Sequence, residues 1–266
     1  MTRREFSFGL PFAGLAAGRA AANPIDEQHY PIRRRKSVEI LFQSPEGHPN
    51  GLEATPEGLW VGEQLTDRAH LLDWSSHEPI ASYETQSSNT SGIAAGGGFV
   101  FMAANGPGQL RPSRAHDVKK GGRIVKLDAK SGKHVENYPT PNGKGLHGLL
   151  WAQKSLWVTQ FGPNKILRAD ANLKVSQEFS APLNRAHGMA WDGDHLWCMF
   201  SNDFRILKFD ITNGRVLEAI QLDSTDPDPH GMTYWDGFLY YCDAGIAPGH
   251  QENKSGFAGS ICRIHV

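Results

Sequence analysis

The chain is short of cysteine and of long apolar segments, and its charges nearly cancel. Its 266 residues include three cysteines, Cys198, Cys242 and Cys262, and carry a formal net charge of −1. So few cysteines exclude a disulfide-dense scaffold and leave buried thiols, which we favour, or a single disulfide. The charge balance indicates no nucleic acid or anionic membrane as partner. No unbroken apolar run is long enough to predict a membrane span.

Helical periodicity and common catalytic motifs are also scarce. The chain has no Gly-x-Ser-x-Gly sequence, and Gly96-Gly97-Gly98 lies in an expected strand-to-strand turn with no helix after it, which argues against a phosphate cradle. What it does have is 29 glycines, 16 prolines and many strand-sized runs bounded by turn residues. These features favour an all-β protein.

A histidine followed by glycine returns at a spacing of roughly 40 residues. The pair occurs at His147-Gly148, His187-Gly188 and His230-Gly231, each time at the start of a similar phrase. Two earlier copies, from Asn50 and Ser91, keep the glycine and replace the histidine. Such a period, with four short apolar runs per copy, predicts the four-stranded blades of a β-propeller.

Counting the copies predicts five blades. In the clearest copy we expect strands over residues 188–191, 195–200, 205–210 and 215–222. The last copy lacks a fourth strand, and the apolar run 38–42 before the first copy would complete it. A strand from the N-terminal end would then close the ring and remove an open sheet edge.

The N-terminal residues resemble an export signal. Thr2 to Phe8 contain the pair Arg3-Arg4, followed by a modest apolar stretch and by Ala20-Ala21-Ala22. We therefore expect a twin-arginine signal peptide over 1–22, a leader over 23–36 and the propeller over 37–266, with the mature protein in a bacterial periplasm or secreted. The alternative is a fortuitous arginine pair, and the basic run 33–36 is expected to be a solvated strand flank.

One face of the predicted propeller collects most of the polar residues of interest. The starts of the innermost strands, the ends of the second strands and the loops that follow them share this face. The innermost strands supply His147, His187, His230 and Asn50; the second strands end at Glu63, Gln160 and Asp243; the two long loops carry Arg111, Arg114, His250 and Lys254. Long loops on a rigid scaffold are where binding and catalysis concentrate.

The three histidines allow three interpretations. They could bind a divalent metal ion, zinc or else magnesium, manganese or calcium, with Glu63 or Asp243 as general base or as a group that orients a ligand histidine. His187 or His230 could instead transfer protons without a metal. The third interpretation is structural, with each histidine bonded to the backbone of a neighbouring blade. In the first two, Asn50, Gln160, Arg111, Arg114, His250 and Lys254 would bind substrate.

The repeat resembles the streptogramin B lyase family (virginiamycin B lyase-like) among NHL and YVTN-type propellers. The resemblance covers residues 38–266 and is carried by His187-Gly188-Met189, Leu196-Trp197 and the run 205–210. It implies a divalent metal and an innermost-strand histidine, here His187 or His230, that acts as general base in a ring-opening elimination. The family's lyases have seven blades, and five blades also occur in glutaminyl cyclases and sugar-active propellers.

Together these features predict an exported propeller enzyme, a metal-assisted lyase or ring-opening hydrolase. Its substrate would be a small polar or carbohydrate-like molecule, and we expect a monomer without nucleic-acid or membrane partners. The alternatives are a lactonase or cyclase of another propeller family, and a non-catalytic periplasmic propeller that binds a ligand or a protein.

Overall fold

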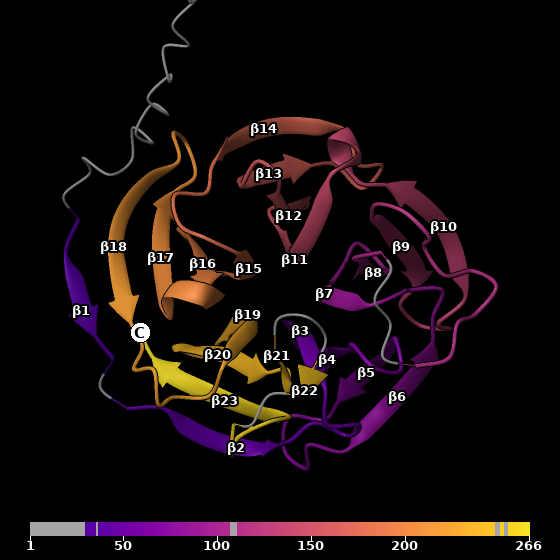
Figure 1. Ribbon diagram of the computed structural model, residues 1–266, viewed down its shortest axis with the longest axis horizontal. Coiled ribbons are helices and arrows are strands. Elements are labelled where there is room, and N and C mark those ends of the chain that lie inside the picture. The colour runs from indigo at the N-terminus through magenta and orange to yellow at the C-terminus, as the bar shows by residue number, and fades with distance from the viewer. Residues whose placement is uncertain (1–29, 36, 107–110, 248–250, 253–254) are drawn as a thin grey trace, which may run out of the picture.

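The chain folds into a ring of five β-sheets around a central axis (Figure 1). The structure, a computed structural model, describes residues 30–35, 37–106, 111–247, 251–252 and 255–266. It confirms the predicted five-bladed, nearly all-β propeller. The expected signal peptide, 1–22, and most of the leader lie outside the described residues, and no helix in the described part is long and apolar enough to cross a membrane.

The first four blades follow one another along the chain, each running outward from the axis (Figure 1). Blade 1 contains β3 (Pro49–Thr55), β4 (Gly58–Glu63), β5 (Arg68–Leu72) and β6 (Pro79–Glu84). Blade 2 contains β7 (Thr90–Gly96), β8 (Phe99–Ala104), β9 (Arg123–Asp128) and β10 (His134–Pro139). Blade 3 contains β11 (Gly145–Ala152), β12 (Ser155–Phe161), β13 (Lys165–Ala169) and β14 (Val175–Ser180), after the 3-10 helix η1 (Pro141–Gly143). Blade 4 contains β15 (Ala186–Trp191), β16 (Leu196–Phe200), β17 (Arg205–Asp210) and β18 (Arg215–Gln221), with η2 (Ser201–Asp203) between β16 and β17.

Blade 5 joins strands from distant parts of the chain, as the sequence predicts. It contains β19 (Pro229–Trp235), β20 (Phe238–Asp243), β23 (Ser260–His265) and, outermost, β2 (Glu39–Gln43). β2 runs antiparallel to β23, with Ile40 opposite Cys262. The long loop between β20 and β23 forms its own small hairpin of β21 (Ile246–Ala247) and β22 (Gln251–Glu252).

The segment before β2 adds a strand that the sequence does not predict. β1 (Ile32–Arg34) runs parallel to β18, so blade 4 has five strands. Next to it, Arg35 forms an ion pair with Asp226, in the connection between blades 4 and 5. The part of the leader that is described therefore packs on the outside of the propeller.

The hydrophobic core is divided among the five boundaries between blades. Clusters of buried side chains lie between each neighbouring pair, including the pair that closes the ring. At one equivalent position, the second strand of every blade contributes a large aromatic residue to these clusters: Trp60, Phe101, Trp157, Trp197 and Tyr240. Each blade can therefore bury its two faces only against its neighbours, which makes the ring the cooperative unit.

The three cysteines also lie within this core. Cys198, Cys242 and Cys262 are free and fully buried. The structure therefore confirms the buried-thiol interpretation, and the alternative of a disulfide is wrong. Thiols enclosed in this way pack as small apolar side chains.

The glycine of each repeated pair is required by the narrow axis. A Cβ atom on Gly148 would lie 1.9 Å from the carbonyl oxygen of His187, and one on Gly92 would lie 2.4 Å from that of His147. These distances are shorter than any ordinary contact, so the innermost strands can meet only where no side chain intervenes. The space that these glycines line on the axis has no room for a water molecule. The propeller therefore has no open channel at this level.

Candidate functional site

A β-bulge in each innermost strand places the side chains at one end of the axis. In β11 the register passes from Leu146 opposite Gln160 to Leu149 opposite Val158, so one residue is extra. The same shift occurs in the innermost strands of the other four blades. Each bulge falls at the start of the strand, where the repeated histidine or its replacement lies. A bulge of this kind re-aims a side chain, and here it does so five times around one axis.

The three histidines of blades 3 to 5 are neighbours on this face. The rings of His147 and His187 are stacked with their centroids 4.9 Å apart and their planes 3° apart. The ring of His230 meets that of His187 edge to face, at 5.1 Å and 83°. On its other side His147 contacts Phe161, at 4.6 Å between ring centroids. The sequence prediction that these histidines gather at the axis is confirmed.

One ring nitrogen of His147 is hydrogen-bonded and the other is not. Its Nδ1 lies 3.2 Å from the carbonyl oxygen of Ala186, which can only accept, so in the neutral ring Nδ1 carries the proton and donates it. Nε2 then carries the lone pair and has no hydrogen-bond partner in the described part of the chain. His147 is also the one of the three that is partly exposed. Burial, with Arg185 as the next cause, lowers its pKa, so the ring is neutral at pH 7.

His230 has both nitrogens engaged. Its Nδ1 donates to the carbonyl oxygen of Asp228 at 3.2 Å, and its Nε2 accepts from the guanidinium of Arg185 at 3.3 Å. The ring is 1% exposed, and burial followed by the charge of Arg185 lowers its pKa to about 4. His230 is therefore a fixed, neutral ring between two charged residues.

His187 is enclosed without a polar partner. It is 0% exposed, and neither ring nitrogen has a hydrogen-bond partner among the described residues. Burial holds its pKa well below the ordinary value. Leaving a buried polar group unbonded costs about 1–3 kcal/mol, so the protein retains this ring at the expense of stability. Such a group is a candidate for contact with a ligand.

Arg185 completes this part of the face and is absent from the sequence predictions. It lies two residues before His187, in a left-handed backbone conformation with φ of 54°. No carboxylate among the described residues lies within 4.0 Å of its guanidinium, although Asp228 attracts it from farther away. The repeat offers a signal for it, since the corresponding positions of blades 1, 2 and 5 hold His48, Asn89 and Asp228.

Glu63 and Asp243, the predicted acid/base residues, each hold the segment that leads into their own blade. Glu63 accepts hydrogen bonds from the hydroxyl of Ser44 and, at 2.9 Å, from the amide of His48. Asp243 accepts from the amides of Asp228 and Gly245, at 3.0 and 2.9 Å. Burial raises the pKa of Glu63 to about 7. These contacts give both residues a positioning role, and their predicted part in catalysis stays a prediction.

Two predicted substrate-binding residues have a buried oxygen without a partner. Asn50 donates from Nδ2 to Gln64 and to the carbonyl of Thr90, at 2.9 and 3.1 Å, which leaves its Oδ1 free of any described partner. In blade 3, Oε1 of Gln160 is in the same situation. Both side chains are 3% exposed. They are acceptors in need of a donor.

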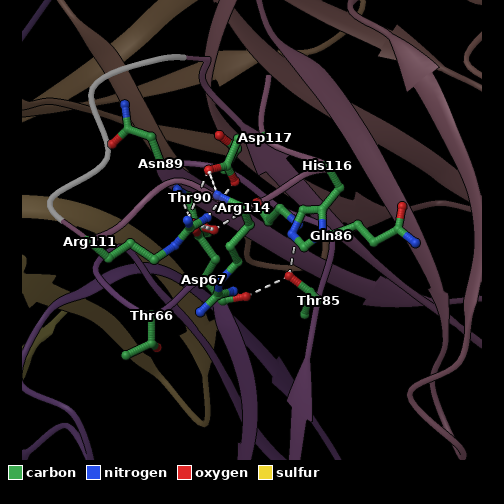
Figure 2. A network of polar contacts seen from close by, with 12 residues as sticks. Thr66, Asp67, Thr85, Gln86, Asn89, Thr90, Arg111, Arg114, His116 and Asp117 are labelled. Carbon is green, nitrogen blue, oxygen red and sulfur yellow. Dashed lines mark hydrogen bonds and ion pairs between the residues drawn. The ribbon is translucent and has the colours of Figure 1, made fainter. Parts of the chain in front are cut away.

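The predicted arginines of the blade 2 insertion belong to a separate network (Figure 2). Arg111 reaches both Asp67 and Asp117, and its side chain is only 8% exposed. Asp67 also accepts from the amide and hydroxyl of Thr90, at 2.9 and 2.8 Å. Arg111 therefore anchors the insertion to blade 1, and Arg114 is exposed beside it.

The other two predicted substrate-binding residues, His250 and Lys254, belong to the insertion between β20 and β23. Both lie outside the described residues.

The three histidines, as oriented, do not fit a metal centre. The planes of His147 and His187 are parallel, so the lone pairs of these two rings do not converge on one point. Both nitrogens of His230 and Nδ1 of His147 are already bonded. No group of three histidine, cysteine or carboxylate side chains within the described ranges is arranged to hold an ion. The divalent ion expected from the sequence stays a prediction, and no step below depends on it.

The fold and this face define the chain as a five-bladed β-propeller with a polar, histidine-lined site at one end of its axis. No family model and no curated protein matches the sequence. Similar solved structures include a glutaminyl cyclase from Myxococcus xanthus, with a TM-score of 0.64 and 10% identity over 89% of this chain and 98% of that one.

Two further solved structures cover most of both chains. A luciferin-regenerating enzyme has a TM-score of 0.53 and 13% identity over 86% of this chain and 95% of its own. A virginiamycin B lyase from Staphylococcus aureus has a TM-score of 0.51 and 14% identity over 86% of this chain and 99% of its own. At such low identity these likenesses show the fold alone, and the resemblance to the lyase family extends no further than a shared propeller.

Proposed function

We propose that this propeller is an enzyme that removes a proton from a small polar substrate bound over the histidines. The observation that carries the proposal is the arrangement of His147. One ring nitrogen donates to a backbone carbonyl, and the other has no hydrogen-bond partner among the described residues, in a residue that is partly exposed. A general base oriented by a third group has this form. The sequence favoured His187 or His230 as the base, but the first is enclosed and the second has both nitrogens engaged.

The reaction class we propose is elimination, ring opening or cyclisation. Nε2 of His147 accepts the proton, and the electron pair that it leaves on the substrate forms the new bond while the leaving oxygen or nitrogen departs. The Ala186 carbonyl keeps its bond to Nδ1–H and stabilises the imidazolium that forms. The guanidinium of Arg185 supplies positive charge next to the site as negative charge develops on the substrate.

Two further observations support this proposal. The solved structures with this fold include proteins named as a cyclase, a luciferin-regenerating enzyme and a lyase. The apparent export motif would place the enzyme in the periplasm or outside the cell, where we propose that it acts as a monomer.

The experiment is a turnover screen of residues 23–266 against small lactones, esters, hydroxy acids and amino-acid derivatives. We expect His147→Gln to abolish the turnover that the wild type shows and His134→Gln, an exposed histidine of β10, to retain it. Both proteins should keep the wild-type melting temperature. Equal turnover by His147→Gln and the wild type would disprove the proposal. Turnover that disappears with a chelator and returns with one divalent ion would instead support the metal-assisted mechanism.

A second function, a ligand-binding propeller without catalysis, is favoured by the unbonded nitrogens of His187. Neither nitrogen has a hydrogen-bond partner among the described residues, so both are available to pair with polar groups of a bound ligand. In that case a compound from the screen would bind the protein and be recovered unchanged. Its affinity would fall in His187→Leu and be unaffected in His147→Gln.

A further inference from the structure

We propose that Arg185 and Asp228 together recognise a zwitterionic substrate, Arg185 binding its carboxylate and Asp228 its ammonium group. The inference rests on the proposed function, since it concerns the substrate class of the same site. The two residues carry opposite charges and lie on either side of His230. Arg185 contacts Nε2 of that ring, and the backbone carbonyl of Asp228 contacts Nδ1.

The charge of Arg185 is held in place without being neutralised. Its carbonyl accepts from the amide of Ser201 at 3.3 Å, which fixes the backbone. The one side-chain hydrogen bond of its guanidinium in the described part of the chain is the 3.3 Å contact with His230. The left-handed conformation of a non-glycine residue adds strain, which persists where function requires it. A guanidinium with unused donors suits a carboxylate, which it can bind through two parallel hydrogen bonds.

Asp228 has the complementary arrangement. Its amide donates to Asp243 and its carbonyl accepts from His230, so the backbone is fixed on both sides. No hydrogen bond to its own carboxylate occurs within the described ranges, and the residue is partly exposed. Asp243 lies close enough to add negative charge. The negative charge of the Asp228 carboxylate favours a cationic group on the ligand.

Arg185 and Asp228 do not neutralise each other. They interact at long range, but they are farther apart than the 4.0 Å of an ion pair. A zwitterion can complete both interactions at once. The unpartnered oxygens of Asn50 and Gln160 on the same face would accept further hydrogen bonds, from the ammonium or from a hydroxyl group of the ligand.

Three compounds of matched size test this assignment. L-Serine carries both charged groups, 3-hydroxypropanoate lacks the ammonium and ethanolamine lacks the carboxylate. We expect titration calorimetry to show binding of L-serine at least about tenfold tighter than of either other compound, which corresponds to one lost charged contact.

Two variants separate the two contacts. Arg185→Gln should weaken L-serine and 3-hydroxypropanoate about equally, and Asp228→Asn should weaken L-serine and ethanolamine. Arg215→Gln, an exposed arginine of β18, is the control that should match the wild type. Equal affinity for the three compounds, absence of binding at millimolar concentration, or wild-type affinities in both variants would overturn the assignment.

The outcome is independent of catalysis. His147→Gln should bind L-serine as the wild type does, even though we expect no turnover from it. If the screen finds turnover of uncharged substrates that His147→Gln abolishes, and L-serine does not bind, the catalytic proposal stands and the zwitterion assignment fails. If L-serine binds as expected and His147→Gln retains turnover, the reverse holds.

Discussion

Two arginines on the same face of the propeller have opposite surroundings. Arg111 is enclosed between Asp67 and Asp117, and Asp67 is further bonded by Thr90. The guanidinium of Arg185 has a histidine nitrogen as its one hydrogen-bond partner and forms no ion pair among the described residues. The first charge is neutralised within the fold, and the second remains available to a ligand. On this face, the degree to which a polar group is already bonded separates a structural residue from a candidate binding residue.

The largest expected difference between the two regions is in stability. Arg111→Met leaves the buried carboxylate of Asp67 without its cation, and breaking such a pair costs about 3–5 kcal/mol. Arg185→Met removes a charge that has no ion-pair partner, and we expect a change within about 1 kcal/mol in either direction. Urea denaturation of both variants gives the two free energies of unfolding. Equal losses would show that Arg185 is as structural as Arg111.

Substitutions of two uncharged side chains, one bonded and one unbonded, compare the same two regions with a smaller expected difference in stability. Thr90→Val removes a hydroxyl that donates to buried Asp67, and we expect a loss of about 1–3 kcal/mol. His187→Leu removes two ring nitrogens that have no partner among the described residues, so it should be neutral or stabilising by about 1 kcal/mol. Thermal unfolding of the two variants measures this difference. A loss of stability in His187→Leu as large as that in Thr90→Val would mean that the ring is part of the scaffold.

The smallest expected effect is the response to acid. The hydrogen bond from Arg111 lowers the pKa of Asp117, so this residue stabilises the fold above its ordinary value of 3.8 and ceases to do so as the pH falls through its lowered pKa. Burial raises the pKa of Asp228 to about 6, so its contribution is present below 3.8 and is lost as the pH rises to about 6.

Stability curves of two variants between pH 3 and 7 test these signs. Relative to the wild type, Asp228→Asn should gain stability between pH 3.8 and about 6, on the order of 1 kcal/mol after solvent screening. Asp117→Asn should be less stable than the wild type at neutral pH and approach it in acid. Parallel curves for the two variants would contradict the contrast between the paired and the unpaired regions.

The sequence predicts the fold well because every repeat needs a glycine at the same position for the same steric reason. The glycine after Asn50, Ser91 and the three histidines is needed wherever innermost strands meet, so it marks every blade. The apolar run that becomes β2 identifies the closing strand. β1 escapes prediction because three residues paired through their backbone leave no apolar pattern.

The site is only partly predictable for a different reason. The convergence of the histidines follows from their equal positions in the repeat. Whether Glu63, Asp243 or Arg111 faces a ligand depends on which partner each meets in space, and all three are bonded within the fold. In the sequence, Arg111 and Arg185 are both arginines near loops. The conformation at Arg185 and the distance of the nearest carboxylate, which set it apart, exist only in three dimensions.

The pairing of β2 with β23 determines when the protein can finish folding. Gln43 and Ser260, which are bonded across these strands, are 217 residues apart in the chain. During synthesis the growing chain carries β2, with an open strand edge, until residues 260–265 have been made. Four sheets can form earlier, but the ring closes only when two distant segments meet, and such long-range contacts form slowly. A chaperone that shields β2 during translation would protect this open edge until the ring can close.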